Sequence, residues 1–448
     1  MRSIYFVILT FIFSTQSSAF IVFPLQQKFR CERSCVPIQY CKTSRKATVQ
    51  LEAVPSSLIT NSNNSNEIWY TDPDLKRADL PSKSSDCRYI ITTLDEGKVC
   101  HLHAYYPDEQ NQEKQIIKPV FLEGDQVEAI LENGIFHDLC ENFELTVDGK
   151  KQISMIWLGN HKKAEVEDVN IEQGRNCVEY WAICSDSDLN IINSEELKRA
   201  AESNLGPGRL SLDFLPLREF GDQIIDYQDA AIHSMANGLI EFHKSHKFCS
   251  ACGSPTILQK AGSSRQCSNS KRRGGTCTAP SIYPRIDVAS IMLITSFCQN
   301  YALLGRKSSW PSGRYSTLAG FLEIGETIEE CCARETLEES GVTVDKDSIQ
   351  FVRSQPWPFP RSLMVGFRAR AEDTIHDGDG EEPNLPEIDF DVIEMEDVKW
   401  FHRDFVAKNL HGGSTAINYV PTNEEREFHI PGKASLANHL ITSWAMEK

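Results

Sequence analysis

The sequence predicts an α+β protein with a β-rich N-terminal domain, a small cysteine module and a C-terminal domain of strands and helices. Its 448 residues are too many for one hydrophobic core, so two or three domains are expected. Short apolar runs separated by polar turns fill residues 68–230, a pattern typical of strands. Residues 286–304 alternate as two further strands, and a segment with helical periodicity, 328–340, follows them. These patterns together indicate the α+β class.

The chain divides into five expected segments, the first of which is a targeting region. Arg2 precedes the apolar run Ile4–Phe13, and the small residues Ser17–Ala19 follow it, which is the layout of a cleavable secretory signal. A buried N-terminal strand or helix is the alternative. The expected segments are 1–19 (signal peptide), 20–67 (transit peptide and polar linker), 68–230 (β-rich domain), 231–284 (helix and cysteine module) and 285–448 (C-terminal domain).

The residues after the signal have the composition of a transit peptide. Residues 20–50 carry six basic side chains and one acid. The junction Ala19-Phe20 resembles the bipartite plastid-targeting signals of algae with secondary plastids, in which an aromatic residue follows the cleavage site. We therefore expect a plastid location, with the secretory pathway or the cytoplasm as alternatives.

Charge and cysteine usage restrict the partners and the compartment. The net charge of −17 argues against non-specific binding to nucleic acid, which requires a basic surface. After the N-terminus no stretch is long and apolar enough to span a bilayer, so no membrane partner is expected. Apart from a cluster of four and an adjacent pair, the 15 cysteines are scattered. Scattered cysteines are usually buried small hydrophobes, which favours a reducing compartment.

A module of four cysteines with metal-ligand spacing follows the β-rich domain. The first two form a CxxC knuckle followed by Gly253, and the third comes after 14 residues, within the range of a zinc ribbon. The fourth comes after nine more residues, and the basic run Lys271–Arg273 makes this gap look like an inserted loop. Four cysteine ligands leave zinc no open position, so the role should be structural, with a redox CxxC as the alternative for the first pair. The expected zinc ligands are Cys249, Cys252, Cys267 and Cys277.

The segment after Gly320 predicts a helix with acidic residues on its inward face. Thr327 and Glu330 form a capping box that starts the helix near Ile328, and Gly341 is placed as its C′ residue. At about 100° per residue, three glutamates continue the apolar stripe of the first turns, whereas a solvated acidic face would lie opposite that stripe. Converging carboxylates repel one another unless cations occupy the cluster, and Mg²⁺ or Mn²⁺ would be the natural occupants. The three glutamates are Glu335, Glu338 and Glu339.

The acidic helix and the residues before it resemble the signature of the Nudix hydrolases. One position departs from the pattern, Thr336, where an aliphatic residue is usual. The resemblance implies the Nudix α/β/α sandwich fold. A non-catalytic binding protein built on the same fold is the alternative, and loss of signature glutamates would support it, but none is lost. The matching residues are Gly320, Glu326, Arg334, Glu335, Glu338, Glu339, Gly341 and Val342.

The resemblance also implies catalytic roles. Glu335 and Glu339 would be the principal Mg²⁺ or Mn²⁺ ligands, with Glu338 in the same cluster, and either Glu338 or Glu339 could be the base. Arg334 would orient a carboxylate through a bidentate pair, and the backbone carbonyl of Ala319 would supply a further ligand. In this family another glutamate often precedes a Trp-Phe strand. The matching position is Glu394, with Glu396 and Asp397 as rivals.

A proline-rich run after the helix indicates the substrate. Three prolines in five positions forbid a helix or a central strand and stiffen a loop that presents two aromatic rings, a suitable platform for a flat base. A purely structural loop is the alternative. The run resembles the hallmark of the NADH pyrophosphatase subfamily, which implies that it walls the nucleotide site, that Ala437 closes this site and that Tyr283 contacts the substrate. The residues of the run are Gln355, Pro356, Trp357, Pro358, Phe359, Pro360, Arg361 and Ser362.

The expected function is therefore hydrolysis of the pyrophosphate bond of NADH or NAD to nicotinamide mononucleotide and AMP, with Mg²⁺ or Mn²⁺ as the catalytic cofactor and structural Zn²⁺. Removal of NAD caps from RNA is the rival enzymatic function, because the same bond is cut. The acidic net charge disfavours RNA, although the Lys271–Arg273 loop could offset it. The subfamily is often dimeric, so a homodimer is expected.

Overall fold

The computed structural model describes residues 87–95, 98–107, 115–131, 134–147, 151–162, 177–185, 193–205, 211–221, 224, 226–373, 385–410 and 427–447. The expected signal peptide, transit peptide and linker, residues 1–67, lie outside these ranges. All the described residues belong to one unit of the chain. Within them, no helix is long and apolar enough to cross a membrane.

The N-terminal part is built on a sheet with the strand order β3-β2-β1-β6-β5-β4, and β7 pairs with β2 outside this path. Strands β1 and β6 are parallel, and the other neighbours are antiparallel. The expectation of a β-rich N-terminal region is confirmed. The bounds are β1 Cys87–Asp95, β2 Lys98–Pro107, β3 Gln115–Pro119, β4 Glu144–Val147, β5 Lys151–Lys162, β6 Cys177–Ser185 and β7 Ser211–Pro216.

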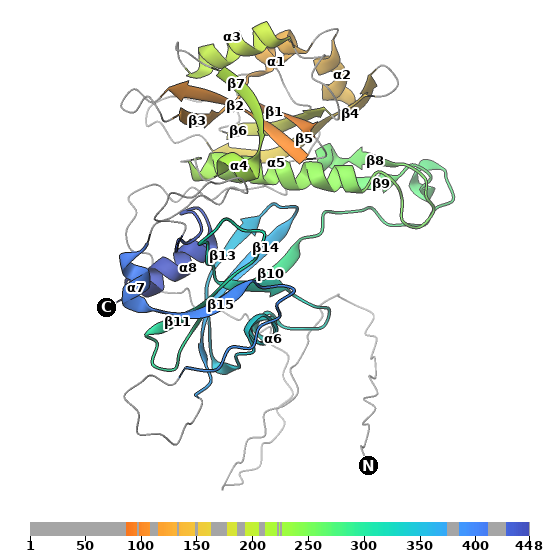
Figure 1. Ribbon diagram of the computed structural model, residues 1–448. Coiled ribbons are helices and arrows are strands. Elements are labelled where there is room, and N and C mark those ends of the chain that lie inside the picture. Colours follow the sequence, from red (N-terminus) through yellow and green to blue (C-terminus); the bar gives the residue numbers. More distant parts are fainter. Residues whose placement is uncertain are drawn as a thin grey trace, which may run out of the picture. The chain divides into compact units, whose positions relative to one another are not determined.

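Helices cover both faces of this sheet. Because side chains alternate along a strand, Tyr89 and Ile91 of β1 pack into one core with α1, α2 and α3, whereas Ile90 packs into another core with α5. Figure 1 shows α1 and α3 on one side of the sheet and α5 on the other. Helices α1 to α4 were not predicted; α1 and α2 have only seven and eight residues, which are too few to display helical periodicity. The bounds are α1 Gly124–Ile130, α2 Ile135–Asn142, α3 Ser194–Leu205, α4 Leu217–Phe220 and α5 Tyr227–Ser245.

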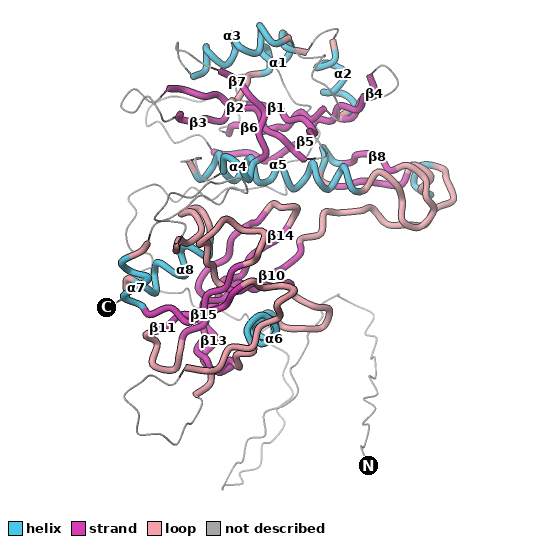
Figure 2. The backbone as a smooth tube through the Cα atoms, viewed as in Figure 1, coloured by secondary structure: helices cyan, strands magenta, loops and turns pink. Residues whose placement is uncertain are grey.

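The cysteine module contains little regular structure. Helix α5 is followed by the first cysteine pair, and strands β8 Thr256–Gln259 and β9 Ser264–Cys267 then form a two-stranded antiparallel sheet. Figure 2 shows mostly loop around this short hairpin and along the chain that follows it. A fold of this size has almost no apolar core of its own, so the four cysteines must contribute to its stability.

The C-terminal sheet has the strand order β13-β14-β10-β11-β15, and β12 pairs with β10. Strands β10 and β14 are parallel, and the other neighbours are antiparallel. The predicted strands at 286–304 are present as β10 and β11. The bounds are β10 Asp287–Thr295, β11 Tyr301–Arg306, β12 Leu318–Phe321, β13 Val344–Trp357, β14 Ser362–Ala371, β15 Asp397–His402, α6 Ile328–Ser340, α7 Arg403–Lys408 and α8 Leu436–Ala445.

Alternation along β10 produces the predicted α/β/α sandwich. Ile291 and Leu293 point to the face covered by α7 and α8, whereas Met292 and Ile294 point to the face covered by α6. Both cores are closed by buried residues, among them Trp444 on α8 and Cys332 on α6. The acidic helix is therefore held against one face of the sheet.

The proline-rich run differs in part from its prediction as a loop. Its first residues, through Trp357, extend β13, and the chain then turns at 358–361 into β14. Strand β13 lies at the edge of the sheet, where a proline without an N–H group is tolerated. The run thus forms a β-hairpin end, and the Phe359–Pro360 peptide in it is cis.

Candidate active site

Helix α6 begins and ends where its sequence predicts. The Thr327 hydroxyl accepts a hydrogen bond from the Glu330 N–H, and the Glu330 carboxylate accepts one from the Thr327 N–H, which completes the capping box. At the other end Gly341 is left-handed with φ of 73°, and its N–H donates to Leu337 O. A Cβ at Gly341 would lie 2.7 Å from Asp389 O, so glycine is required by both conformation and space.

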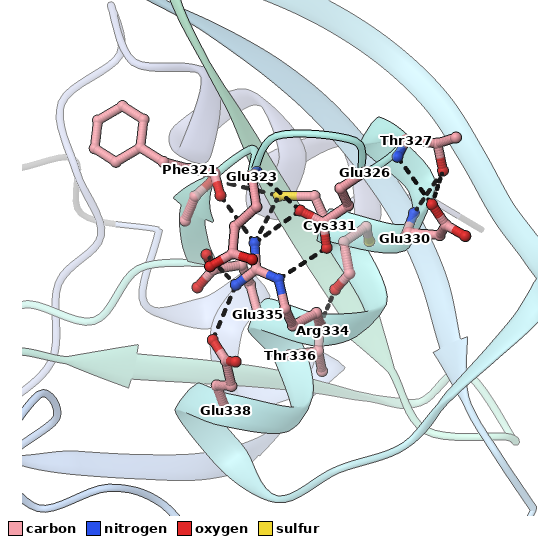
Figure 3. Close-up of polar contacts among 12 residues, drawn as sticks. Phe321, Glu323, Glu326, Thr327, Glu330, Cys331, Arg334, Glu335, Thr336 and Glu338 are labelled. Atoms are coloured by element: carbon pink, nitrogen blue, oxygen red, sulfur yellow. Dashed lines mark hydrogen bonds and ion pairs between the residues drawn. The ribbon is translucent and has the colours of Figure 1, made fainter. Parts of the chain in front are cut away.

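Arg334 is the centre of a carboxylate network (Figure 3). Its Nε and Nη2 each donate to a different oxygen of Glu326 over 2.8 and 2.9 Å, a bidentate pair. Its Nη1 donates to Glu335 over 2.8 Å and to Glu338 over 2.9 Å, and its Nη2 also reaches the Phe321 carbonyl over 2.9 Å. The hydrogen bonds from Arg334 hold the pKa of Glu326 below its usual value. The guanidinium therefore fixes the orientation of Glu335 from one side.

Glu339 is the most buried of the three helix glutamates, at 2% exposure. Burial raises the pKa of its carboxyl to about 7, against the opposing effect of the Lys307 ammonium 3.4 Å away. The Ala319 N–H donates to Glu339 over 3.1 Å. A residue's N–H and C=O leave an antiparallel strand on the same side, so the Ala319 carbonyl also faces the acidic helix.

Glu335 lies directly on the backbone of β12. A Cβ at Gly320 would fall 1.7 Å from the Glu335 carboxyl carbon, so any other side chain would displace this carboxylate. Burial raises the pKa of Glu335, and the charge of Glu394 adds to the rise. Glu394 is exposed, and its charge acts on the Glu335 carboxyl; its role as a further metal ligand stays a prediction. Its rivals have other partners: Glu396 pairs with Arg306, and Asp397 accepts from the Tyr315 hydroxyl and pairs with Lys399.

The inward orientation expected for Glu338 is wrong. Its side chain is 58% exposed and is held at the helix surface by Arg334 one turn away. The helical azimuth places Glu338 at the margin of the stripe, where a neighbouring cation decides its direction. Glu335 and Glu339, together with the Ala319 carbonyl, form a compact group of oxygen atoms whose chemistry fits a hard divalent cation.

A cavity of about 440 Å³ adjoins this acidic group at Ala319. Three other predicted residues line it: Gln355, Trp357 and Ala437. Gln355 accepts a hydrogen bond from the Leu436 N–H over 2.7 Å, so the hairpin and the start of α8 form a continuous wall. The remaining lining residues are Arg218, Ile291, Ser309, Trp310, Pro311, Arg314, Ser316, Thr317, Met364, Pro431, Ser435 and Leu436.

Other residues predicted for the nucleotide site do not line the cavity. Phe359 packs edge-on against Trp357 with ring centroids 5.2 Å apart. Tyr283 is 46% exposed, and its hydroxyl and ring contact Lys260. Of the residues predicted for the nucleotide site, seven are not part of the cavity lining: Tyr283, Pro356, Pro358, Phe359, Pro360, Arg361 and Ser362.

Three cations at the site were not found from the sequence: Lys307, Arg218 and Arg314, of which Arg218 and Arg314 line the cavity. Lys307 pairs with Glu339, and Arg218 of α4 lines the cavity with its guanidinium carbon 5.7 Å from the ring centroids of both Trp357 and Phe359. Arg218 precedes Trp357 by more than a hundred residues, and no local pattern marks it. Only the fold brings the two together.

The four predicted cysteines meet in the structure. Their sulfurs all lie within 4.8 Å of one another, with Cys249 and Cys277 3.9 Å apart and Cys252 and Cys267 3.5 Å apart. Zinc–sulfur bonds of 2.3 Å in a tetrahedron place the sulfurs about 3.8 Å apart, so the cluster fits zinc. The wide gap before Cys277 is closed by its own backbone bonds, from Cys277 N to Asn269 O and from Lys271 N to Cys277 O. A metal site accounts for all four thiols, whereas a redox pair would need only two.

Comparison with known proteins yields two domain matches. Residues 285–413 match the NUDIX domain, and residues 244–273 match the NADH pyrophosphatase zinc ribbon domain. The second match ends before Cys277, in the loop with unusual spacing.

Similar proteins carry related names. The NAD-capped RNA hydrolase NudC of Mycobacterium bovis is 36% identical over 247 residues, covering 55% of this chain and 70% of that protein. The NAD-capped RNA hydrolase NUDT12 of Homo sapiens is 34% identical over 217 residues, covering 48% of this chain and 42% of that protein. A solved NUDIX hydrolase from Nitrosomonas europaea is 25% identical, covers 36% of this chain and 79% of that one, and has a TM-score of 0.27.

Proposed function

Because this chain belongs to the Nudix hydrolases of the NADH pyrophosphatase type, we propose that it cleaves the pyrophosphate bond of NADH and NAD, giving nicotinamide mononucleotide and AMP. One observation carries the proposal. Ala319 borders both the buried Glu339 carboxylate and the cavity walled by Trp357, so a dinucleotide with its base in the cavity presents its pyrophosphate to the acidic group.

Glu335, Glu339, Glu394 and the Ala319 carbonyl would hold Mg²⁺ or Mn²⁺. When bound, these ions neutralise pyrophosphate charge and lower the pKa of water. Arg334 keeps the Glu335 carboxylate in one orientation. The absence of a side chain at Gly320 lets this carboxylate lie against the backbone of β12. Either Glu338 or Glu339 takes the proton of the attacking water. The larger part of catalysis is then positioning and charge compensation.

Trp357 would be the stacking surface for one base, and Gln355 and Ala437 would complete the wall. Arg218 would add a cation beside the same surface, where its charge suits a polyanionic substrate. Phe359, Pro360, Arg361 and the other residues of the hairpin would act by supporting Trp357 rather than by touching the base.

A product assay tests this proposal. With Mg²⁺ or Mn²⁺ present, NADH and NAD should yield nicotinamide mononucleotide and AMP in equal amounts, and ADP-ribose and NAD-capped RNA should be run in parallel. Exclusive turnover of ADP-ribose would reject a dinucleotide site. A folded protein inactive on all four substrates would support the non-catalytic alternative.

Removal of NAD caps from RNA is a second candidate function, favoured by a local basic surface. Lys271, Arg272 and Arg273 are all exposed, and none of the three forms an ion pair with another described residue. Relatives of this chain are named NAD-capped RNA hydrolases, which supports RNA as the partner of this surface. Phosphate contacts made by three cations would steepen the salt dependence of binding.

A triple variant separates the two substrates. Replacing Lys271, Arg272 and Arg273 with Gln should raise KM for NAD-capped RNA and flatten its salt dependence, while KM for NADH stays unchanged. Equal kinetics of the variant and the parent enzyme on RNA would remove this surface from the proposal.

The proposal also includes a homodimer and a location in a plastid. Sedimentation tests the homodimer, and a targeting fusion tests the plastid location. Tyr283 would contact the substrate only if another surface brings its exposed ring to the cavity.

A further inference from the structure

A chain of buried polar side chains runs from the N-terminal sheet to the proline-rich hairpin. His101 lies on β2, His233 and Asn237 lie on α5, and Pro358 lies in the hairpin turn. The two histidines are fully buried and Asn237 is 6% exposed. Successive atoms are within hydrogen-bond distance: His233 Nδ1 to His101 Nδ1 over 3.0 Å, His101 Nε2 to Asn237 Oδ1 over 3.3 Å, and Asn237 Nδ2 to Pro358 O over 2.6 Å.

The chemistry of the last link fixes the direction of every other link. The Pro358 carbonyl can only accept, so the Asn237 amide must donate to it, which turns the Asn237 oxygen toward His101. His101 must therefore carry its proton on Nε2 and accept on Nδ1, and His233 must donate from Nδ1. Burial lowers the pKa of His101 to about 4 and also lowers that of His233, so both rings are neutral at pH 7, as this arrangement requires.

The hairpin needs an external anchor of this kind. Three of its residues are prolines, which have no N–H to donate, and it lies at the sheet edge, where β13 has a neighbour on one side only. Helix α5 also approaches it closely: a Cβ at Gly238 would lie 3.7 Å from Arg361 Cγ and 4.0 Å from Pro360 O. Asn237 thus bonds the carbonyl between the two aromatic residues, Trp357 and Phe359.

We propose that Asn237 is a positioning residue for dinucleotide binding, which holds the hairpin at Pro358 and so sets the angle of Trp357 at the cavity wall. The N-terminal sheet then has a role in substrate binding, because His101 and His233 keep the Asn237 amide turned toward the hairpin. This inference rests on the proposed use of Trp357 as the base platform.

Two variants and a matched control test it kinetically. Asn237→Ala removes the hydrogen bond and side-chain volume, whereas Asn237→Leu removes the bond and keeps most of the volume. The loss of a single net hydrogen bond predicts a rise in KM for NADH of about two-fold to ten-fold in both. Gly238→Ala faces the same hairpin without losing a bond, and its added carbon meets only an ordinary contact, so its KM should match the parent enzyme. Turnover of a small pyrophosphate lacking a base should be unchanged in all three.

A second readout does not depend on NADH turnover. The indole N–H resonance of Trp357, identified by its loss in Trp357→Phe, should shift in Asn237→Leu and stay in place in Gly238→Ala. A parental KM and an unshifted resonance in Asn237→Leu would overturn the inference. Equal loss of activity on the base-free pyrophosphate would also overturn it, since the effect would then be general destabilisation. A resonance shift in a protein whose parent form does not cleave NADH would reject the proposed function while leaving the structural link intact.

Discussion

Among the glutamates of α6, Glu339 is the one whose carboxyl is buried. It is nearly inaccessible and accepts a hydrogen bond from the Ala319 N–H, and burial, with the charge of Glu335 adding to the effect, raises its pKa. A carboxylate this deeply buried is costly even with Lys307 beside it, so its presence indicates a function that uses negative charge. The same physical feature made it predictable, because its azimuth on the helix follows the buried stripe.

Glu339→Gln should therefore abolish most turnover while leaving the fold intact. The neutral amide keeps the shape but removes a ligand charge worth several kcal/mol, so kcat for NADH should fall roughly a hundred-fold or more. Steady-state kinetics with a thermal melt as the folding control measure this. Glu329→Gln, on the exposed face of the same helix, serves as the matched control. Near-parental rates in a folded Glu339→Gln protein would remove Glu339 from the mechanism.

Trp357 belongs to binding rather than to chemistry. Base–aromatic stacking contributes roughly 1–3 kcal/mol per base, so Trp357→Ala should raise KM for NADH by about ten-fold to a hundred-fold. The contact is shared by ground and transition states, so kcat should change less. Phe351→Ala, an exposed residue on the same strand, is the control. A lower kcat with unchanged KM would mean that the hairpin has a purely structural role.

At the scale of elements, local patterns predicted those parts whose signals are local. The capping box at Thr327 and the glycine at Gly341 define α6, and alternation defines β10. The direction of Glu338 was not predictable in this way, because Arg334, which holds it outward, is fixed by contacts with Glu326 from before the helix. A side chain with one strong partner points toward that partner, whatever direction the helical periodicity predicts for it.

The zinc ribbon illustrates the same limit in its fourth ligand. Three cysteines have ordinary spacing, but Cys277 reaches the cluster because the loop from Asn269 folds back through its own hydrogen bonds. Sequence spacing alone made Cys277 the least secure ligand, whereas the geometry makes it equivalent to the others.

Metal analysis of Cys252→Ala should show loss of about one zinc per chain together with lower thermal stability. The small hairpin of β8 and β9 has few apolar contacts, so metal binding contributes directly to its folding. Cys298→Ala, which removes an exposed cysteine outside the cluster, should retain zinc. An unchanged zinc content in Cys252→Ala would mean that these thiols are not ligands.

At the scale of the whole molecule, the decisive contacts join segments that are far apart in the chain. Arg218 and Asn237 belong to helices preceding the zinc ribbon, yet both contact the hairpin at 357–359. No periodicity or motif in either segment indicates such a contact, because it depends on how separate cores are joined. These contacts give the N-terminal part, which carries no catalytic pattern of its own, a place in substrate binding.

The N-terminal 60 residues should direct a fluorescent protein to a plastid. Their composition combines a secretory signal with a basic, acid-poor stretch, and a stroma would keep the thiols reduced. The fusion is observed by microscopy in an algal host with secondary plastids. A fusion lacking residues 1–19 is the control. Accumulation in the medium or the cytosol would refute the location without affecting the enzymatic proposal.

Arg218→Ala tests whether the N-terminal part contributes to the site directly. The guanidinium is equidistant from the Trp357 and Phe359 rings, and its Nε is buried without a hydrogen-bond partner in the described structure. Cation–π contacts contribute about 0.5–2 kcal/mol, so KM for NADH should rise by roughly two-fold to thirty-fold with kcat less affected.

The double variant Arg218→Ala/Trp357→Ala then decides how the arginine acts. If Arg218 works by fixing the indole, its removal should have little further effect once Trp357 is absent, and the two free-energy changes will not add. If it binds the phosphates of the substrate on its own account, the two effects should be additive and the KM of Arg218→Ala should depend less on salt. An Arg218→Ala enzyme with parental KM would exclude both modes, and the N-terminal part would then act on the hairpin through Asn237 alone.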